Sequence, residues 1–460
     1  MAGEEISNVS VQEPANPGLV EGVAHENPVV TSDAAGNEQE AAVLATKFQH
    51  LSLSAQTIHA DDYLNSHQSV APPMHVSTTF RYNDDPDKLN PWANINPNNP
   101  YDSHVYSRDS APNTSRLEAV LTSILHGPSL TYSSGLSSFH ALLVYLNPRR
   151  VAIAGGYHGC HGVIQVLTKL TGLQTLSLFD KDLESKIQPG DVVHVETPLN
   201  PTGEARSLKY FADIAHKRGA YLTVDATFAP PPLQDPFLFG ADVIMHSGTK
   251  YFGGHSDMLC GVLAVNPKHA TGEKNWIKGL REERLVLGSV MGSFEGWLGV
   301  RSLRTLEVRV RKQSVDAEKL VRWLASQAEK DGTLVNEAVA EIKHASLQKK
   351  DLEEGWLKEQ MPNGFGPVFA VYLRDADEAR RLPSKLALFH HATSLGGVES
   401  LVEWRAMTDA GVDKRLLRFS IGLEGFEDLR DDLIKGFEAL KKERKAKENA
   451  GGGANIIGGA

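Results

Sequence analysis

The chain has 460 residues, of which 41% are hydrophobic and 23% charged, a composition typical of a globular protein with room for two or three domains. Its net charge of −10 argues against nucleic-acid binding, and no apolar run reaches the roughly 18 residues that a membrane span needs. With only Cys160 and Cys260, the sequence also argues against a disulfide scaffold or a cysteine-rich zinc site.

The first 50 residues form an acidic leader. They contain eight acidic residues and one lysine, so this segment carries −7 of the net charge. They hold a single aromatic residue and no periodic apolar face, which predicts disorder over 1–50. The opening MAGEEISNVS lacks the basic head and the apolar run of a secretory signal, and we therefore expect a cytoplasmic protein.

Helix-like and strand-like segments alternate from about residue 114 to residue 310. TSRLEAVLTSILHG, GLSSFHALLVYL, HGVIQVLTKL and SLKYFADIAHKR have helical character, whereas SLTYSS, VAIA, QTLSLF, DVVHVET, YLTVDA and ADVIMHS are short and β-rich. Apolar strands without strict alternation predict an α/β fold, in which helices cover both faces of a mostly parallel sheet. In such a sheet, ligands bind at the carboxyl ends of the strands.

A second unit follows a long helical stretch that begins near residue 310. It contains the strand-like GPVFAVYL and LRFSIGL, a helix around DEARRLPSKL and the terminal helix FEDLRDDLIKGFEALKKER. These segments predict a smaller C-terminal α+β domain over 311–446. The glycine-rich end, over 447–460, predicts a flexible tail.

Two of the predicted strands end in groups that can bind a ligand. In YSSGLSS (132–138), the free N–H groups of Gly135 and Leu136 can form an anion site at a helix N-terminus, unless Ser134 merely caps that helix. In YLTVDATF, Asp225 ends an apolar strand, where a carboxylate needs a cation or hydrogen-bond donors. The alternative for Asp225 is a cap of the next turn.

The third strand end lies in MHSGTKYFGGHSD (245–257). Ser247 and Thr249 come just before Lys250 in the sequence. Two hydroxyls beside an amine suit a ligand that carries both a phosphate monoester and a carbonyl. A lysine that forms an imine must be neutral, so its pKa must fall below the usual value of about 10.4. Alone, Lys250 would be a solvated surface charge. Together with Asp225 it matches the needs of pyridoxal phosphate (PLP), which requires a lysine, an acid and an anion cradle.

From about residue 57 to residue 445 the sequence resembles the Cys/Met-metabolism family of PLP enzymes, the γ-family of fold type I. DVIMHSGTKYFGGHS (242–256) satisfies the lysine signature of that family throughout, and the chain is most similar to a fungal branch of it. The resemblance implies a PLP-binding large domain over 114–310 and a homo-oligomer, at least a dimer and usually a tetramer. It also implies elimination or γ-replacement on a sulfur amino acid or an activated homoserine, as in cystathionine γ-synthases and lyases.

The resemblance further implies a role for each matching residue. Lys250 would hold PLP and shuttle protons, Asp225 would pair with the pyridine nitrogen, and Tyr157 would stack on the ring. Arg418 and Ser394 would bind the substrate carboxylate. The other cofactor contacts implied are Gly135, Leu136, Ser247 and Thr249 at the phosphate, Asn200 near the ring hydroxyl, and Tyr106 and Arg108, from an N-terminal arm over 51–113, at the phosphate of the neighbouring subunit.

Several of these side chains could instead have a purely structural role. Tyr157 alone would be a packing residue and Arg418 alone a surface ion pair. His158 and His255 lack a third ligand at suitable spacing and are expected to hydrogen-bond within loops, so we predict no metal site.

The substrate pocket departs from the family pattern at several positions. Ala226 replaces an asparagine, the segment after Arg108 is one residue longer, and Thr393 stands where a glutamate is common. Asp109 occupies a position where some γ-synthases carry an arginine, and its charge would repel a distal carboxylate. Three alternatives therefore stay open: γ-substitution with a non-sulfur nucleophile, a fold type I aminotransferase, and a PLP-binding protein without catalysis.

Overall fold

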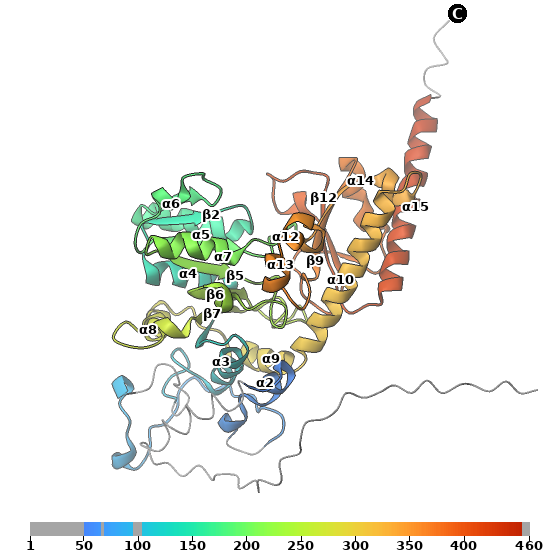
Figure 1. Ribbon diagram of the computed structural model, residues 1–460. Coiled ribbons are helices and arrows are strands. Elements are labelled where there is room, and N and C mark those ends of the chain that lie inside the picture. The colour runs from blue at the N-terminus through green and yellow to red at the C-terminus, as the bar shows by residue number, and fades with distance from the viewer. Residues whose placement is uncertain (1–49, 66–68, 95–103, 453–460) are drawn as a thin grey trace, which may run out of the picture.

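A seven-stranded sheet organises the larger of two domains in the computed structural model, which describes residues 50–65, 69–94 and 104–452 (Figure 1). The strand order is β1-β7-β6-β5-β4-β2-β3, and β7 alone runs antiparallel to its neighbours. The predicted mostly parallel sheet is therefore confirmed, whereas the acidic leader lies outside the described residues. The strands are β1 Ser129–Tyr132, β2 Arg150–Ile153, β3 Gln174–Ser177, β4 Val192–Glu196, β5 Tyr221–Asp225, β6 Val243–Ser247 and β7 Gly261–Val265.

Helices bury both faces of this sheet. On β6, Ile244 joins one apolar cluster and its neighbours Val243 and Met245 join another, because successive side chains of a strand point to opposite faces. Leu208 of α7 packs in the first cluster and Leu142 of α4 in the second. The helices are α3 Pro112–Ile124, α4 Gly135–Leu146, α5 His158–Thr171, α6 Leu183–Lys186, α7 Leu208–Lys217, α8 Trp276–Leu287 and α9 Ser293–Leu303.

A second, five-stranded sheet with the order β10-β11-β12-β9-β8 forms the smaller domain. Its core holds the stacked rings of Phe369 and Phe419, which lie on the neighbouring strands β9 and β12. The long helix α10 leads into it from the large domain, and α15 runs along its outer side (Figure 1). The elements are α10 Leu306–Ala328, α11 Leu334–Ala338, β8 Val339–Lys343, α12 Lys349–Glu353, α13 Trp356–Gln360, β9 Val368–Leu373, α14 Ala376–Arg381, β10 His390–His391, β11 Leu401–Trp404, β12 Leu416–Ser420 and α15 Phe426–Gly452.

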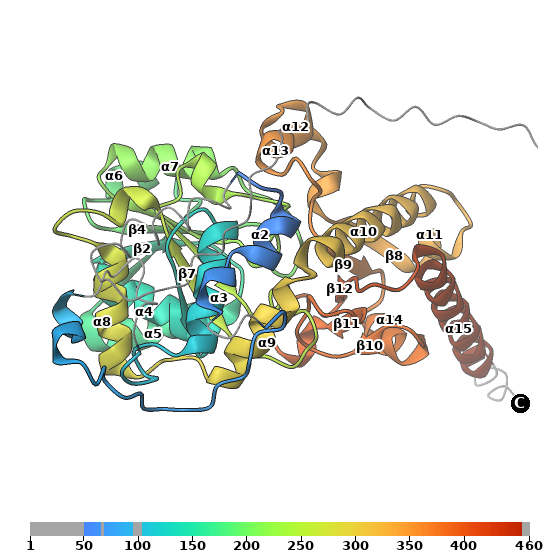
Figure 2. The same cartoon turned by 90° about the horizontal axis from the view of Figure 1, so that it is seen from below.

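The segment before α3 wraps the outside of the large domain. Helix α2 (Leu53–His59) lies against α3, and the extended chain after it passes α9 and α8 (Figure 2). Asp61 holds the start of this segment through a buried ion pair with Arg116 and a partly buried one with Arg304, both 2.7 Å long. Further along, Trp297 of α9 donates a hydrogen bond to the carbonyl of Pro72.

Helix α15 continues to Gly452, beyond residue 446, where the sequence predicts that the small domain ends. The segment KKERKAKENA is made almost entirely of lysine, glutamate, arginine and alanine, which are strong helix formers. Local propensity therefore carries the helix past the last core residue of this element, Leu440. None of the described helices combines the length and the apolar character needed to cross a membrane.

Candidate active site

Three polar side chains gather at the carboxyl ends of adjacent parallel strands. Glu196 ends β4, Asp225 ends β5 directly opposite it in the strand register, and Lys250 follows β6 after one short turn. The apolar residues before each of them are buried in the sheet, so the polar groups are held at its edge. The topology thus places Lys250 and Asp225 at the carboxyl ends of neighbouring strands.

The small domain contributes the loop that covers Lys250. Lys250 Nζ donates a 2.7 Å hydrogen bond to Ser394 Oγ, and Ser394 has a φ of +78°, a conformation that costs a non-glycine residue about 1–3 kcal/mol. At Gly396 a Cβ would lie 3.0 Å from the carbonyl carbon of Lys250, so only glycine allows this close approach. The loop thereby fixes the lysine from the side opposite the sheet.

The surroundings of Lys250 favour the neutral form of its amine. Burial, and then the positive charge of Arg418, lower the pKa of Lys250 to about 8, although Glu403 acts in the opposite direction. A lysine with a pKa in this range has a substantial neutral fraction near neutral pH, as a nucleophilic or proton-transferring amine requires.

The two strand-end carboxylates have different partners. Asp225 Oδ1 accepts hydrogen bonds from the amide and the hydroxyl of Thr227, at 3.0 and 2.5 Å, while among the described residues no donor contacts Oδ2. Burial raises the pKa of Asp225. Glu196 accepts from the amides of Tyr157, at 2.8 Å, and Asn200, at 2.6 Å. Glu196 therefore holds the two loops that carry predicted site residues.

Arg418 ties three of these segments together from the middle of β12. Its Nη1 donates to Asn200 Oδ1 at 3.1 Å, and its Nη2 donates to the carbonyl of Ser394 at 2.8 Å. The same Nη2 forms a 2.5 Å ion pair with Glu403. Arg418 is buried, which corrects the reading of this residue as a surface ion pair.

The N-terminus of α4 faces the end of β6. A Cβ at Gly135 would lie 3.1 Å from Ser247 Oγ, so the hydroxyl and the first turn of the helix are adjacent. Ser134 also caps the helix, because its Oγ accepts from the amide of Ser137 at 3.1 Å. Both predicted roles of this strand end are thus compatible, and helix N–H groups beside a hydroxyl suit an anion.

Tyr157 lies beside the first turn of α4, and Thr249 is turned toward β7. The Tyr157 ring and the Leu136 side chain lie together above Gly159, where a Cβ would meet both within 2.9 Å. Tyr157 is 38% exposed. Thr249 Oγ1 accepts from the amide of Cys260 at 3.0 Å, so its hydroxyl also anchors the lysine loop to the sheet.

The family assignment follows from comparison with known proteins. A model of the Cys/Met metabolism PLP-dependent enzymes matches residues 54–438. The chain belongs to this family.

Relatives in the Cys/Met metabolism family carry several activities at nearly the same distance. Cystathionine gamma-lyase of Saccharomyces cerevisiae is 31% identical over 411 residues, which cover 85% of this chain and 97% of the relative. Cystathionine gamma-synthase of Escherichia coli is 32% identical over 398 residues, covering 81% and 94%. Cystathionine beta-lyase of Lactococcus lactis strain MG1363 is 31% identical over 364 residues, covering 74% and 89%. The chain is thus a PLP enzyme of the cystathionine lyase and synthase type, without one activity being singled out.

Solved structures of the family share the fold. The yeast cystathionine gamma-lyase structure has a TM-score of 0.73 and 29% identity, and covers 85% of this chain and 98% of its own. The metB structure from Corynebacterium glutamicum has a TM-score of 0.74 and 27% identity, and covers 85% and 99%. These comparisons confirm the expected fold type with its large and small domains.

The residues present fit PLP, the cofactor of this family. A partly buried amine with a lowered pKa, a buried carboxylate with one unengaged oxygen and a helix N-terminus beside Ser247 lie at the carboxyl ends of the central strands. Gly135 leaves no room for a side chain between the helix and Ser247, so the first turn of the helix and the hydroxyl stay close together. Aldehyde, pyridinium nitrogen and phosphate would each meet a suitable group.

Two predicted site residues of the family lie apart from Lys250 in the single chain. Arg108 donates to the carbonyl of Leu285 on α8 at 2.9 Å, and its guanidinium lies 5.3 Å from the centre of the Tyr106 ring. Both side chains are exposed. Their predicted contact with a neighbouring subunit remains a prediction.

The expected repulsion by Asp109 is wrong. Asp109 is buried, and its two oxygens accept from Nε and Nη2 of Arg281, each at 3.0 Å. Its charge is therefore neutralised within the chain. The sequence could not show this pairing, because 172 residues separate the partners.

Glu196, Glu403 and Arg405 are the polar residues near the site that sequence reasoning missed. Glu196 could have been predicted, because it ends an apolar strand in the same way as Asp225 ends the next strand. Glu403 and Arg405 lie on and just after β11, a strand that the sequence did not reveal. Glu403 pairs with Arg405 just beyond β11 and with Arg418 on the next strand, so these pairs could not be assigned while β11 itself was unknown.

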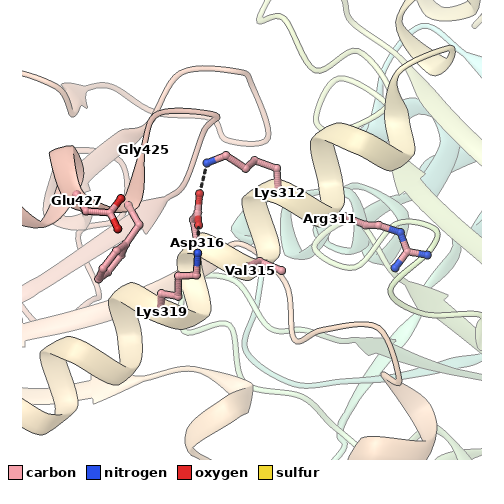
Figure 3. Close-up of a pocket in the computed structure, with 8 residues that line it drawn as sticks. Arg311, Lys312, Val315, Asp316, Lys319, Gly425 and Glu427 are labelled. Atoms are coloured by element: carbon pink, nitrogen blue, oxygen red, sulfur yellow. Dashed lines mark hydrogen bonds and ion pairs between the residues drawn. The ribbon is translucent and has the colours of Figure 1, made fainter. Parts of the chain in front are cut away.

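Other polar groups show no second centre of this kind. His255 Nδ1 contacts the carbonyl of Gly253 at 2.8 Å, as expected for a loop hydrogen bond. Over the described ranges, no three His, Cys, Asp or Glu side chains are grouped to hold a metal ion. A surface depression along α10 is lined by none of the predicted site residues, and in it Asp316 pairs with Lys312 and Lys319 (Figure 3).

Replacing Glu196 by glutamine is expected to reduce the pH dependence of stability. Burial, and then the nearby Asp225, raise the pKa of Glu196 from 4.5 to about 8. The folded chain thus keeps a proton that the unfolded chain releases, so this stabilisation is present below pH 4.5 and is lost as the pH rises toward about 8. Thermal unfolding of cofactor-free protein at about pH 5 and about pH 8 should show a Tm decrease of a few degrees in the wild type and a smaller one in E196Q, which keeps Asp225. Parallel pH profiles of the two proteins contradict the assignment.

Proposed function

We propose that the protein catalyses elimination or replacement of a sulfur-bearing group at Cβ or Cγ of an amino acid. The observation that carries this proposal is that Lys250 and Arg418 both hydrogen-bond to Ser394, one to its hydroxyl and the other to its carbonyl. A carboxylate held by Arg418 would place the adjacent Cα close to the amine. That juxtaposition suits removal of the α-proton, the step that such eliminations share.

The cofactor assignments follow from the same geometry. Lys250 would hold the aldehyde of PLP, and Asp225 would pair with the pyridine nitrogen through Oδ2. When bound, the cofactor supplies an electron sink for negative charge that develops on the substrate. The remaining contacts proposed are Tyr157 over the ring, Asn200 near the ring hydroxyl, Gly135, Leu136, Ser247 and Thr249 at the phosphate, and Tyr106 and Arg108 from a second copy of the chain.

The side chains then divide the work between binding and proton transfer. Arg418 and Ser394 orient the substrate carboxylate, since a guanidinium matches a carboxylate in two-point geometry. Lys250 takes the proton from Cα and returns one to the leaving group, and its pKa of about 8 suits both steps near neutral pH. The covering loop at Gly396 limits the access of water from one side.

Steady-state assays with three substrates test this function. Cystathionine, O-acetylhomoserine with cysteine, and methionine separate lyase, synthase and methionine-cleaving activities, which are the activities named for relatives of similar identity. We expect turnover of at least one, and no amino-group transfer to 2-oxoglutarate. Inactivity on all three contradicts the sulfur assignment, and efficient transamination would replace it with an aminotransferase.

We also propose that the active form is a homo-oligomer. Tyr106 and Arg108 are exposed on the N-terminal arm and lie away from Lys250 in their own chain, which suits a contribution to a neighbour. Sedimentation analysis should give at least a dimer, and a monomer with full activity contradicts this. The two buried free cysteines, Cys160 and Cys260, fit a reducing compartment such as the cytoplasm.

A further inference from the structure

Two guanidinium groups share one carboxylate beside the proposed site. Glu403 Oε2 forms ion pairs with Arg418 Nη2 at 2.5 Å and with Arg405 Nη1 at 3.1 Å. All three side chains are at most 4% exposed. This cluster, Glu403–Arg405–Arg418, lies at the base of the loop that carries Ser394, because Arg418 also donates to the Ser394 carbonyl.

The cluster carries an excess positive charge. One carboxylate faces two guanidinium groups, which leaves a net charge of about +1 in a buried place, where an uncompensated charge is costly. The other contacts of the cluster do not compensate it: Glu403 Oε1 accepts from the Thr408 hydroxyl at 2.7 Å, and Arg418 meets the neutral Asn200. Arg405 Nε is buried and has no hydrogen-bond partner among the described residues. An anion is the missing component.

The two arginines of the cluster have different contacts and therefore different roles in its charge balance. Arg418 bonds to Asn200 and to Ser394, the residue that also contacts Lys250, whereas Arg405 contacts Glu403 and Thr408. If Arg405 were neutral, Glu403 would cancel the charge of Arg418. A substrate carboxylate would then bring the buried cluster to a net charge of −1 instead of zero.

We propose that Arg405 is a positioning residue for substrate binding: it neutralises Glu403, so that the charge of Arg418 remains available to the carboxylate of the amino acid. This inference rests on the proposed role of Arg418 in binding that carboxylate. Arg405 itself does not touch the substrate and acts through Glu403. The ligand class is an amino acid with a free α-carboxylate. The affinity for the amide of that amino acid should not depend on Arg405.

Calorimetric titration of the holoenzyme with glycine and with glycinamide tests this inference. Arg405→Met removes the charge and keeps most of the aliphatic volume. We expect R405M to bind glycine about tenfold to a hundredfold more weakly, since Glu403 would then cancel the positive charge of Arg418, and glycinamide within about threefold of the wild type. With a turned-over substrate, the same variant should raise KM far more than it lowers kcat.

A compensating variant and a matched control complete the experiment. The double variant E403Q/R405M restores a net charge of about +1, and we expect it to recover most of the affinity for glycine. Thr408→Val removes a hydroxyl that contacts both Glu403 and Arg405 but no charge, and should change the affinity for glycine by less than about threefold. If R405M does not fold, E403Q alone serves instead, because its added net positive charge should strengthen glycine binding.

The outcomes separate this inference from the proposed function. Wild-type affinity of R405M for glycine, equal weakening of glycine and glycinamide, no recovery in the double variant, or weaker glycine binding by E403Q overturns the role of Arg405. A holoenzyme that binds glycine as described but turns over no sulfur amino acid leaves that role standing and contradicts the proposed reaction.

Discussion

Replacing Lys250 by alanine is expected to lower kcat by about 10³-fold or more, because the variant loses both the amine that would hold the cofactor and the group that would move protons. The structure supports so large an effect, since the amine is partly buried, has its pKa lowered to about 8 and bonds to Ser394 beside Arg418, the proposed carboxylate-binding residue. The measurement is kcat with whichever sulfur amino acid the wild type turns over.

The covalent link gives a second measurement that does not depend on activity. Borohydride reduction of the holoenzyme followed by peptide mass mapping should find a pyridoxyl group on Lys250, and none on the K250A variant. Lys209→Ala is a suitable control, because Lys209 is a lysine of α7 with a side chain that is 68% exposed, and its loss should leave kcat unchanged. A K250A variant within tenfold of the wild type, or a label on another lysine, contradicts the assignment.

Much of the large domain could be predicted from local sequence. The strands that carry Glu196, Asp225 and Ser247 are continuous apolar runs, and runs of this kind are typical of parallel strands buried on both faces. Since such strands end at one edge of their sheet, the juxtaposition of Asp225 and Lys250 follows from their positions alone. The antiparallel orientation of β7 was not predicted, because an apolar run such as GVLAV fits a parallel and an antiparallel strand equally well.

The contributions of the small domain could not be predicted in the same way. Ser394 meets Lys250 across 144 residues of sequence, and this contact depends on how two domains pack. Only the resemblance to a known family pointed to it. Arg405 shows the limit most clearly: its role depends on a carboxylate two residues away and an arginine on the next strand, and no spacing rule separates this arrangement from an ordinary surface ion pair.

Replacing Asp225 by asparagine is expected to lower kcat by about 10²- to 10³-fold, the usual effect of removing one fixed electrostatic group from an active site. The substitution keeps an oxygen that can accept from Thr227 but removes the negative charge that would hold a proton on the pyridine nitrogen. The neighbouring carboxylate, Glu196, already accepts hydrogen bonds from two backbone amides, so it is less free to replace Asp225. Asp213→Asn, on a side chain that is 64% exposed, is the matched control. The affinity of cofactor-free D225N for PLP, measured by equilibrium dialysis, should fall as well, because a charge-assisted hydrogen bond contributes about 1.5–3 kcal/mol. If D225N keeps kcat within threefold of the wild type, the carboxylate is not the partner of the ring nitrogen, and Glu196 becomes the residue to test.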